Sequence, residues 1–162
     1  MPEGSLRGTL RLLSENHVDF ILVGGLAAVL QGVPVSTYDV DIVHSREAAN
    51  VQRLLSSLAT LDAIFRIQPS RRLKPDVSHL TGHGHINLIT RLGSLDLLCT
   101  IGDGLTYEQL LPYSERMDLE EGLAIRVLRL EKLIELKEQL GSEKDRAMLP
   151  LLRRTLEEKR RG

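Results

Sequence analysis

Residues 19–43 read DFILVGGLAAVLQGVPVSTYDVDIV, and this stretch decides the fold. Its apolar runs and turn residues predict, in chain order, a buried strand over 20–23, a Gly24-Gly25 turn, a short apolar helix over 26–30 and a second strand over 38–43. A strand, a helix and a second strand within 25 residues are typical of a chain that mixes the two kinds of element around one core.

The second strand of this stretch carries two acids, Asp39 and Asp41. Side chains alternate between the faces of a strand, so two carboxylates at i and i+2 point the same way, about 6–7 Å apart. At that separation they repel by about 2–3 kcal/mol at an effective dielectric constant near 20. The pair therefore predicts a cation between the carboxylates, and Mg²⁺ (or Mn²⁺) with a phosphate-bearing substrate is the natural occupant.

Composition limits the class of protein. The chain has 162 residues, of which 42% are apolar and 27% charged, with a net charge of −1. This length favours one compact domain or a core with an appendage. Cys99 is the only cysteine, so no internal disulfide forms, and the polar start MPEGSLRGTL is unlike a signal peptide. No apolar run approaches membrane-spanning length, and we expect a cytoplasmic protein with no membrane partner.

Charge is distributed unevenly along the chain. Residues 1–125 hold 10 basic and 15 acidic side chains, whereas residues 126–162 hold 11 basic and 7 acidic ones. A basic C-terminal part is suited to the phosphates of a nucleotide or an RNA, although a solvated helical face has the same composition. Aromatic residues make up only 3%, which argues against a dedicated single-strand binder that stacks bases.

The rest of the chain alternates between helical and strand patterns. We expect helices over 5–16, from an N-cap at Ser45 to 61, and over 105–113, 129–140 and 142–161. We expect strands over 63–67, 84–90 and 94–100, a polar loop after residue 67, and a hairpin over 117–128 that turns at Gly122. Pro150 predicts a kink or a new start in the last helix. The predicted architecture is α/β (α+β): a mixed sheet packed with helices in a core over 1–125, and a helical appendage over 126–162 that packs on it as one compact unit.

A third acid, Asp96, lies between Leu95 and Leu97 on a predicted strand. An unpaired buried carboxylate is costly, so such a residue usually has a partner or changes its protonation. If this strand lies beside the one with Asp39 and Asp41, the three acids share one site and can hold two metal ions. Asp96 is then a metal ligand or the base that accepts a proton from the nucleophile. The alternative for Asp96 alone is an edge-strand acid that faces water.

Several other residues are candidates for nucleotide binding. Gly24 and Gly25 allow backbone N–H groups to approach an anion closely, although such a pair often marks only a tight turn. Ser36 and Thr37 can donate hydroxyl hydrogen bonds to the same phosphates, or simply cap a turn.

A lysine interrupts the apolar stripe of the helix over 129–140. Leu130, Leu133, Ile134, Leu136 and Leu140 form the stripe, and Lys137 falls near its centre. A lysine in that position extends its amine to solvent or binds an anion, and we expect a nucleotide phosphate contact. Lys144 is a second candidate contact. Ser142-x-x-Asp145 resembles a helix-capping sequence.

The ordered combination of these motifs resembles the nucleotidyltransferase-fold superfamily. GG, a dozen residues, T-x-D-x-D on a strand and a later apolar-D-apolar strand cover about residues 18–100. The segments GGLAAVLQG, STYDVDIV and LITRLGSLDLL are most similar to minimal bacterial nucleotidyltransferases of the abortive-infection toxin type. Related toxins also carry a lysine like Lys137, followed by a K-D pair. Relatives often have arginine near position 35, where this chain has Val35, and this weakens the expected phosphate contact.

The resemblance implies a nucleotidyltransferase-like mixed sheet and transfer of a nucleoside monophosphate from an NTP, with Mg²⁺ required and pyrophosphate released. It gives Gly24, Gly25, Asp39, Asp41 and Asp96 the family's motif roles. The acceptor stays open among an RNA end, a protein and a small molecule. A cognate antitoxin is an implied partner.

Two other functions fit the same motifs. An antibiotic nucleotidyltransferase shares the GG and D-x-D layout and needs extra acids for a cationic drug, for which Asp103 and Glu108 are candidates. A non-catalytic binding or antitoxin module can use the same fold as a platform.

Two local clusters also allow other interpretations. His79, His83 and His85 are candidates for a zinc site, and Arg71, Arg72 and Lys74 are candidates for acceptor contacts.

Overall fold

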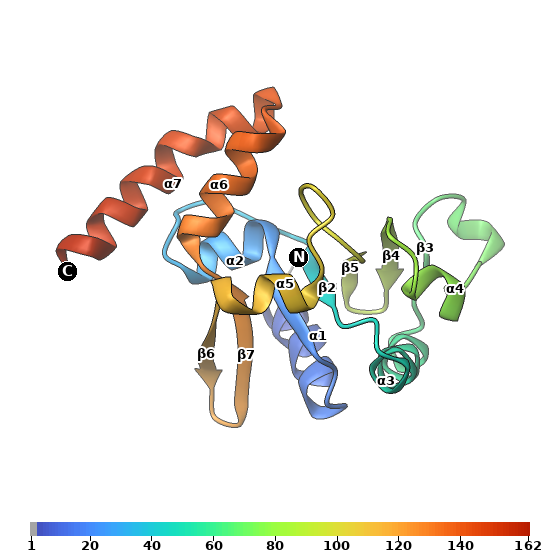
Figure 1. The fold of residues 1–162 in the computed structure, drawn as a ribbon. Coiled ribbons are helices and arrows are strands. Elements are labelled where there is room, and N and C mark those ends of the chain that lie inside the picture. Colours follow the sequence, from blue (N-terminus) through green and yellow to red (C-terminus); the bar gives the residue numbers. More distant parts are fainter. Residues whose placement is uncertain (1–2) are drawn as a thin grey trace.

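One mixed sheet organises the molecule, and helices pack on both of its faces (Figure 1). The structure is a computed structural model, and it describes residues 3–162. The strands are β1 (Phe20–Val23), β2 (Val40–His44), β3 (Ile64–Phe65), β4 (His85–Thr90), β5 (Gly93–Leu98), β6 (Ser114–Glu120) and β7 (Leu123–Leu128). The helices are α1 (Glu3–Glu15), α2 (Gly24–Leu30), α3 (Ala48–Thr60), α4 (Val77–Leu80), α5 (Tyr107–Leu110), α6 (Leu130–Leu140) and α7 (Glu143–Arg161), with 3₁₀ turns η1 (Pro69–Arg71) and η2 (Leu111–Tyr113). Among these helices none is both long and apolar enough to cross a membrane.

The order of the strands explains how distant segments meet. The sheet runs β3-β4-β5-β2-β1-β7-β6, with β2/β5 and β1/β7 parallel and the other pairs antiparallel. This arrangement confirms the predicted mixed sheet. It puts β2, which follows the Gly24-Gly25 turn, in the centre between β1 and β5.

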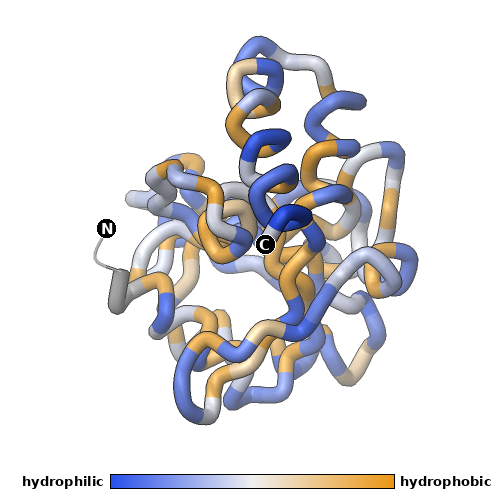
Figure 2. The backbone as a smooth tube through the Cα atoms, turned by 90° about the vertical axis from the view of Figure 1, so that its left-hand side faces the viewer, coloured by the Kyte–Doolittle hydropathy of each residue, from blue (hydrophilic) through white to orange (hydrophobic). Residues whose placement is uncertain are grey.

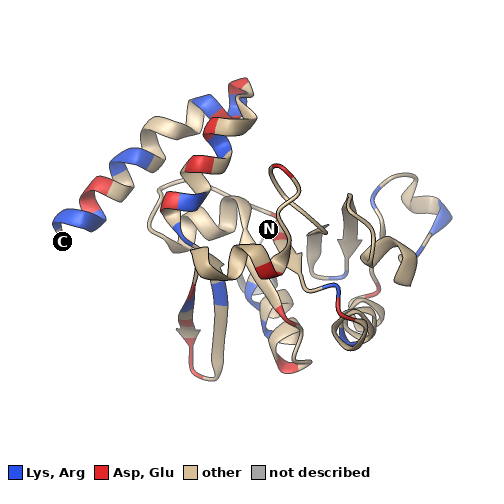
Figure 3. Cartoon of the chain, viewed as in Figure 1, with Lys and Arg blue, Asp and Glu red and all other residues tan. Residues whose placement is uncertain are grey.

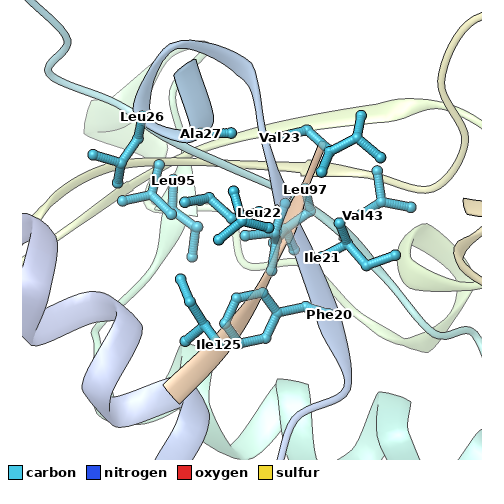
Figure 4. Close-up of a cluster of buried hydrophobic side chains, with 14 of the residues drawn as sticks. Phe20, Ile21, Leu22, Val23, Leu26, Ala27, Val43, Leu95, Leu97 and Ile125 are labelled. Carbon is cyan, nitrogen blue, oxygen red and sulfur yellow. The ribbon is translucent and has the colours of Figure 1, made fainter. Parts of the chain in front are cut away.

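The central strands are fixed by burial. β1 is buried at every position because both of its faces are covered, as its unbroken apolar run predicts. Leu22, Ile42 and Leu97 are opposite one another in adjacent strands and belong to one core cluster, which Figure 4 shows in part. Helix α1, which contacts both α3 and β7, adds three fully or nearly buried leucines, Leu6, Leu10 and Leu13. This packing holds the carboxyl end of β1, where the glycine turn begins.

The C-terminal helices form a hairpin that projects from the sheet (Figure 2). α6 buries an apolar stripe and ends at Gly141, whose φ of 64° is the left-handed conformation typical of helix ends. Ser142 then caps α7 by accepting a hydrogen bond from the Asp145 N–H, which confirms the predicted cap. The predicted boundary between core and appendage, at residue 125, falls within β7; the sheet continues to Leu128 and the hairpin starts at Leu130.

Several local predictions are wrong. β2 begins at Val40, so Asp39 precedes the strand instead of lying on it. The N-cap of α3 is Glu47, and Ser45, two residues before this cap, accepts a hydrogen bond from the Glu47 N–H through its hydroxyl. The predicted loop after β3 contains η1 and α4, because Asp76 and His79 form a capping box that stabilises one short helical turn. Pro150 does not start a new helix, since α7 continues through it; of the two predicted outcomes, a kink is the one that a continuous helix leaves open.

Candidate active site

The turn between β1 and α2 is shaped to bring Asp41 close to the backbone. Gly24 has a φ of 71°, a conformation that side chains disfavour, and a Cβ atom there would overlap the Asp41 carboxylate. A Cβ on Gly25 would lie 2.9 Å from Thr37 Oγ1. Both positions therefore require glycine, because the segment that carries Thr37 and Asp41 passes too close to leave room for a Cβ atom.

Asp41 and Asp96 are neighbours in the sheet. They are register partners in the parallel strands β2 and β5. The two strands therefore adjoin, which is the condition under which the sequence predicted a shared site. Burial raises the pKa of Asp41 to about 7, assisted by a hydrogen bond that the protonated Asp41 carboxyl group donates to Asp96 and by the charges of Asp96 and Asp39. Two acids that share a partly buried place hold a proton, or another cation, more readily than isolated carboxylates.

An arginine that was not predicted from the sequence completes the acid pair. Arg66 Nη2 lies 2.6 Å from Asp96 Oδ1, and the Arg66 charge lowers the pKa of Asp41. Arg66 comes directly after β3, and its backbone N–H donates to the Asn87 carbonyl of β4. The sequence contained one signal for this role: Arg66 is the single charged residue in the apolar run IFRI. The sequence predicted a strand there but did not indicate which strand lies beside it in the sheet.

A cavity of about 390 Å³ opens beside Asp41, between the sheet and the α6–α7 hairpin. Its lining includes all predicted site residues except Asp96, namely Gly24, Gly25, Ser36, Thr37, Asp39, Asp41, Lys137 and Lys144. Val35, Ser142, Asp145 and apolar residues of α2, α6 and α7 complete the wall. The structure thus brings segments 24–25, 35–41 and 137–145 to one site, and Asp96 is the register partner of Asp41 in the next strand.

Lys137 forms an ion pair with an acid of the next helix. Its Nζ lies 3.2 Å from Asp145 Oδ1, and its side chain is 25% exposed. The Ser142 hydroxyl, together with Lys137, lowers the pKa of Asp145. Asp145 therefore contacts both the Ser142 cap of α7 and the lysine at the edge of the cavity, a combination that the capping pattern alone did not predict. Figure 3 shows basic and acidic residues mixed along both helices of the hairpin.

The histidine cluster has structural contacts. His79 Nδ1 accepts a hydrogen bond from the Asp76 N–H, and its ring packs edge-on against Phe65. His83 Nδ1 lies 3.1 Å from Arg46 Nη1. Over residues 3–162 no three His, Cys, Asp or Glu side chains converge closely enough to form a ready metal site. In the loop nearby, Arg72 pairs with Asp62 and Arg71 donates to Gln68.

Two solved structures are similar to this architecture over almost its whole length. The first is a lincosamide antibiotic adenylyltransferase, LnuA, in its lincomycin-bound form, with a TM-score of 0.62 and 16% sequence identity over 94% of this chain and 97% of that one. The second is a putative nucleotidyltransferase from Thermotoga maritima, with a TM-score of 0.56 and 22% identity over 94% of this chain and 91% of that one. No protein-family model and no curated protein sequence matches the chain. The chain has the nucleotidyltransferase fold.

The acids of this nucleotidyltransferase fold offer a donor set that suits a divalent cation. Asp41 and Asp96 are adjacent carboxylates, and Asp39 is close enough for its charge to raise the pKa of Asp41. Mg²⁺ typically takes one or two protein carboxylates and completes its shell with water and substrate phosphates. The adjacent pair Asp41 and Asp96 fits this manner of binding, although the three acids together do not converge as a ready metal site within residues 3–162.

Proposed function

We propose that the protein is a metal-dependent nucleotidyltransferase that moves a nucleoside monophosphate from an NTP to an acceptor hydroxyl or phosphate. The observation that carries the proposal is the convergence, on one cavity of about 390 Å³, of a glycine turn, two acids and two lysines that come from separate parts of the chain. The cavity is large enough for much of a nucleotide, since small-molecule sites begin near 300 Å³.

Each wall of the cavity has a role in binding the triphosphate. Backbone N–H groups at Gly24 and Gly25 and the hydroxyls of Ser36 and Thr37 donate hydrogen bonds to phosphate oxygens. Lys137 and Lys144 balance the phosphate charge from the opposite wall. Val35 lies in the same wall, so the arginine found near this position in relatives has no counterpart here, and the lysines supply the positive charge instead.

The acids serve the transfer itself. Asp39, Asp41 and Asp96 would hold Mg²⁺ or Mn²⁺, which neutralises charge on the triphosphate and activates the attacking oxygen. Asp96, the register partner of Asp41, would be a metal ligand or the base that accepts the proton of an acceptor hydroxyl. The acceptor oxygen forms a bond to the α-phosphorus while the bond from that phosphorus to the bridging oxygen breaks, and pyrophosphate leaves.

The direct test is transfer of label from each α-labelled NTP to components of a cell extract. We expect Asp39→Asn and Asp41→Asn to abolish transfer while the circular dichroism spectrum is retained. Asp118→Asn, an exposed acid of β6, is the matched control and should keep full activity. Unchanged transfer in either Asp39→Asn or Asp41→Asn would refute the catalytic assignment. A non-catalytic platform, the rival function, would show no Mg²⁺-dependent nucleotide binding at all.

The remaining candidate functions differ in the acceptor of the nucleotide. The sequence resemblance favours a toxin-type enzyme that acts in the cytoplasm on an RNA end or a protein and is neutralised by an antitoxin. The likeness to LnuA along nearly all of both chains favours a small-molecule acceptor such as an antibiotic. Label that is recovered in RNA or protein, with growth arrest on expression, supports the first; label on added lincomycin supports the second.

A further inference from the structure

A single cross-strand row connects the acids to Arg66. Successive register partners are Val23 and Asp41, Asp41 and Asp96, and Asp96 and Asn87. The backbone N–H of Arg66 donates to the carbonyl of Asn87, which extends the row by one more strand. Partners directly opposite in a sheet point to the same face, so the acids and Arg66 share one face.

One nitrogen of the Arg66 guanidinium group, Nη2, is hydrogen-bonded to this row, whereas another, Nε, has no partner. Its Nη2 donates to Asp96 Oδ1 at 2.6 Å and to the Leu88 carbonyl at 3.3 Å. Its Nε is buried without a hydrogen-bond partner. The side chain of Asp96 is 15% exposed and that of Arg66 36%, so the pair lies where water screens it only in part.

A divalent cation and Arg66 need the same carboxylate. Carboxylate oxygens accept either a guanidinium fork or a metal ion, and a fixed positive charge beside the site opposes a second one. A nucleotide changes this balance because its triphosphate brings several negative charges into the neighbouring cavity.

We propose that Arg66 is the resident counter-ion of the Asp41–Asp96 pair, which a divalent cation must displace, so that the metal binds tightly only together with a triphosphate. This inference rests on the proposed function, since it takes the acids as the metal site. Arg66 acts through Asp96 and is a positioning residue. If Arg66 has this role, a bare divalent ion binds poorly and the metal enters the site as its complex with the nucleotide.

The test uses Mn²⁺ and the full chain after removal of metal by EDTA. Electron paramagnetic resonance of free Mn²⁺ gives the affinity for the bare ion in wild type, Arg66→Met, Arg66→Lys and Arg72→Met. Arg72 is a matched control because it forms a similar 2.8 Å ion pair with Asp62, with both side chains more than half exposed. Thermal unfolding with Mn²⁺ alone and with Mn²⁺ plus inorganic tripolyphosphate, a probe without a base, gives the dependence on phosphate and checks folding.

We expect Arg66→Met to bind bare Mn²⁺ up to about fivefold more tightly than wild type, because a partly exposed ion pair contributes a factor of up to about five. Arg66→Lys, which keeps the charge, should resemble wild type, and Arg72→Met should be unchanged. The additional stabilisation by tripolyphosphate should shrink in Arg66→Met. Equal or weaker Mn²⁺ binding in Arg66→Met, or equal binding in Arg66→Lys and Arg66→Met, overturns the inference while the metal site stands. If Mn²⁺ binds none of the proteins even in the presence of tripolyphosphate, or binds unchanged after Asp41→Asn is added, the proposed function falls as well.

Discussion

One wall of the cavity comes from the sheet and the β1–α2 turn, and the opposite wall comes from the α6–α7 hairpin. On the sheet wall, glycines admit the Asp41 carboxylate and buried strands fix its position. On the hairpin wall, Lys137, Ser142 and Asp145 contact one another at the water-exposed end of two helices. Under the proposed function, the sheet wall would hold reacting groups in place, whereas the hairpin wall would supply charge that adjusts to a bound nucleotide.

The largest effect should come from a methyl group on the sheet wall. Gly24→Ala places a Cβ against the Asp41 carboxylate at a positive φ, and we expect a loss of about 3 kcal/mol or more in the free energy of unfolding. Gly104→Ala is the control, since Gly104 has a φ of 86° and no atom lies within 4 Å of the place that its methyl carbon would take. That variant should lose only about 1–2 kcal/mol, the backbone cost alone. Urea denaturation measures both values, and similar losses would mean that Asp41 can move away from the turn.

A smaller, pH-dependent effect should distinguish the acids of this wall. The pKa of Asp41 is about 7 in the folded protein against an ordinary value of 3.8, so the folded state keeps a proton that the unfolded chain releases. The stability of the metal-free protein should therefore decrease as pH rises from about 4 to 7 on account of this group. Asp41→Asn removes the decrease, and its advantage over wild type should grow by about 1–4 kcal/mol across this window.

Urea denaturation in EDTA at pH 5 and pH 8 measures this advantage. Asp39→Asn is the control, because Asp39 lies outside β2 and only adds its charge to the surroundings of Asp41. An advantage of Asp41→Asn that is the same at both pH values would contradict the raised pKa.

The two walls also differ in how far the sequence predicted them. The sheet wall is local in the chain: Gly24, Asp39 and Asp41 lie within 18 residues, and the alternation of side chains along a strand was enough to group them, although the strand starts one residue after Asp39. The Arg66–Asp96 pair joins residues 30 apart through the register of β3, β4 and β5, and no local pattern specifies that register. Lys137 was predicted from its position in an apolar stripe, but its pairing with Asp145 depends on the turn at Gly141.

The smallest expected change in stability lies on the hairpin wall. Lys137→Ala removes a partly exposed ion pair, so the free energy of unfolding should fall by less than about 1 kcal/mol, while the affinity for the Mg²⁺–NTP complex falls about tenfold. Lys132→Ala, on the same helix, is the matched control. The Lys132 side chain is 10% exposed, pairs with Glu135 at 3.0 Å and lies 4.2 Å from the centre of the Tyr113 ring. Its loss should cost about 1–2 kcal/mol of stability and leave nucleotide affinity unchanged.

Titration calorimetry with the NTP that serves in the transfer assay, together with urea denaturation, separates the two lysines. The reverse result, a large loss of stability in Lys137→Ala with normal nucleotide affinity, would make Lys137 a packing residue whose amine only reaches Asp145. The hairpin would then be a cover for the core, and the phosphate charge would have to be balanced by Lys144 and the bound cation alone. The expected result instead assigns opposite tasks to two lysines five residues apart, with Lys132 holding α6 in place and Lys137 meeting the nucleotide.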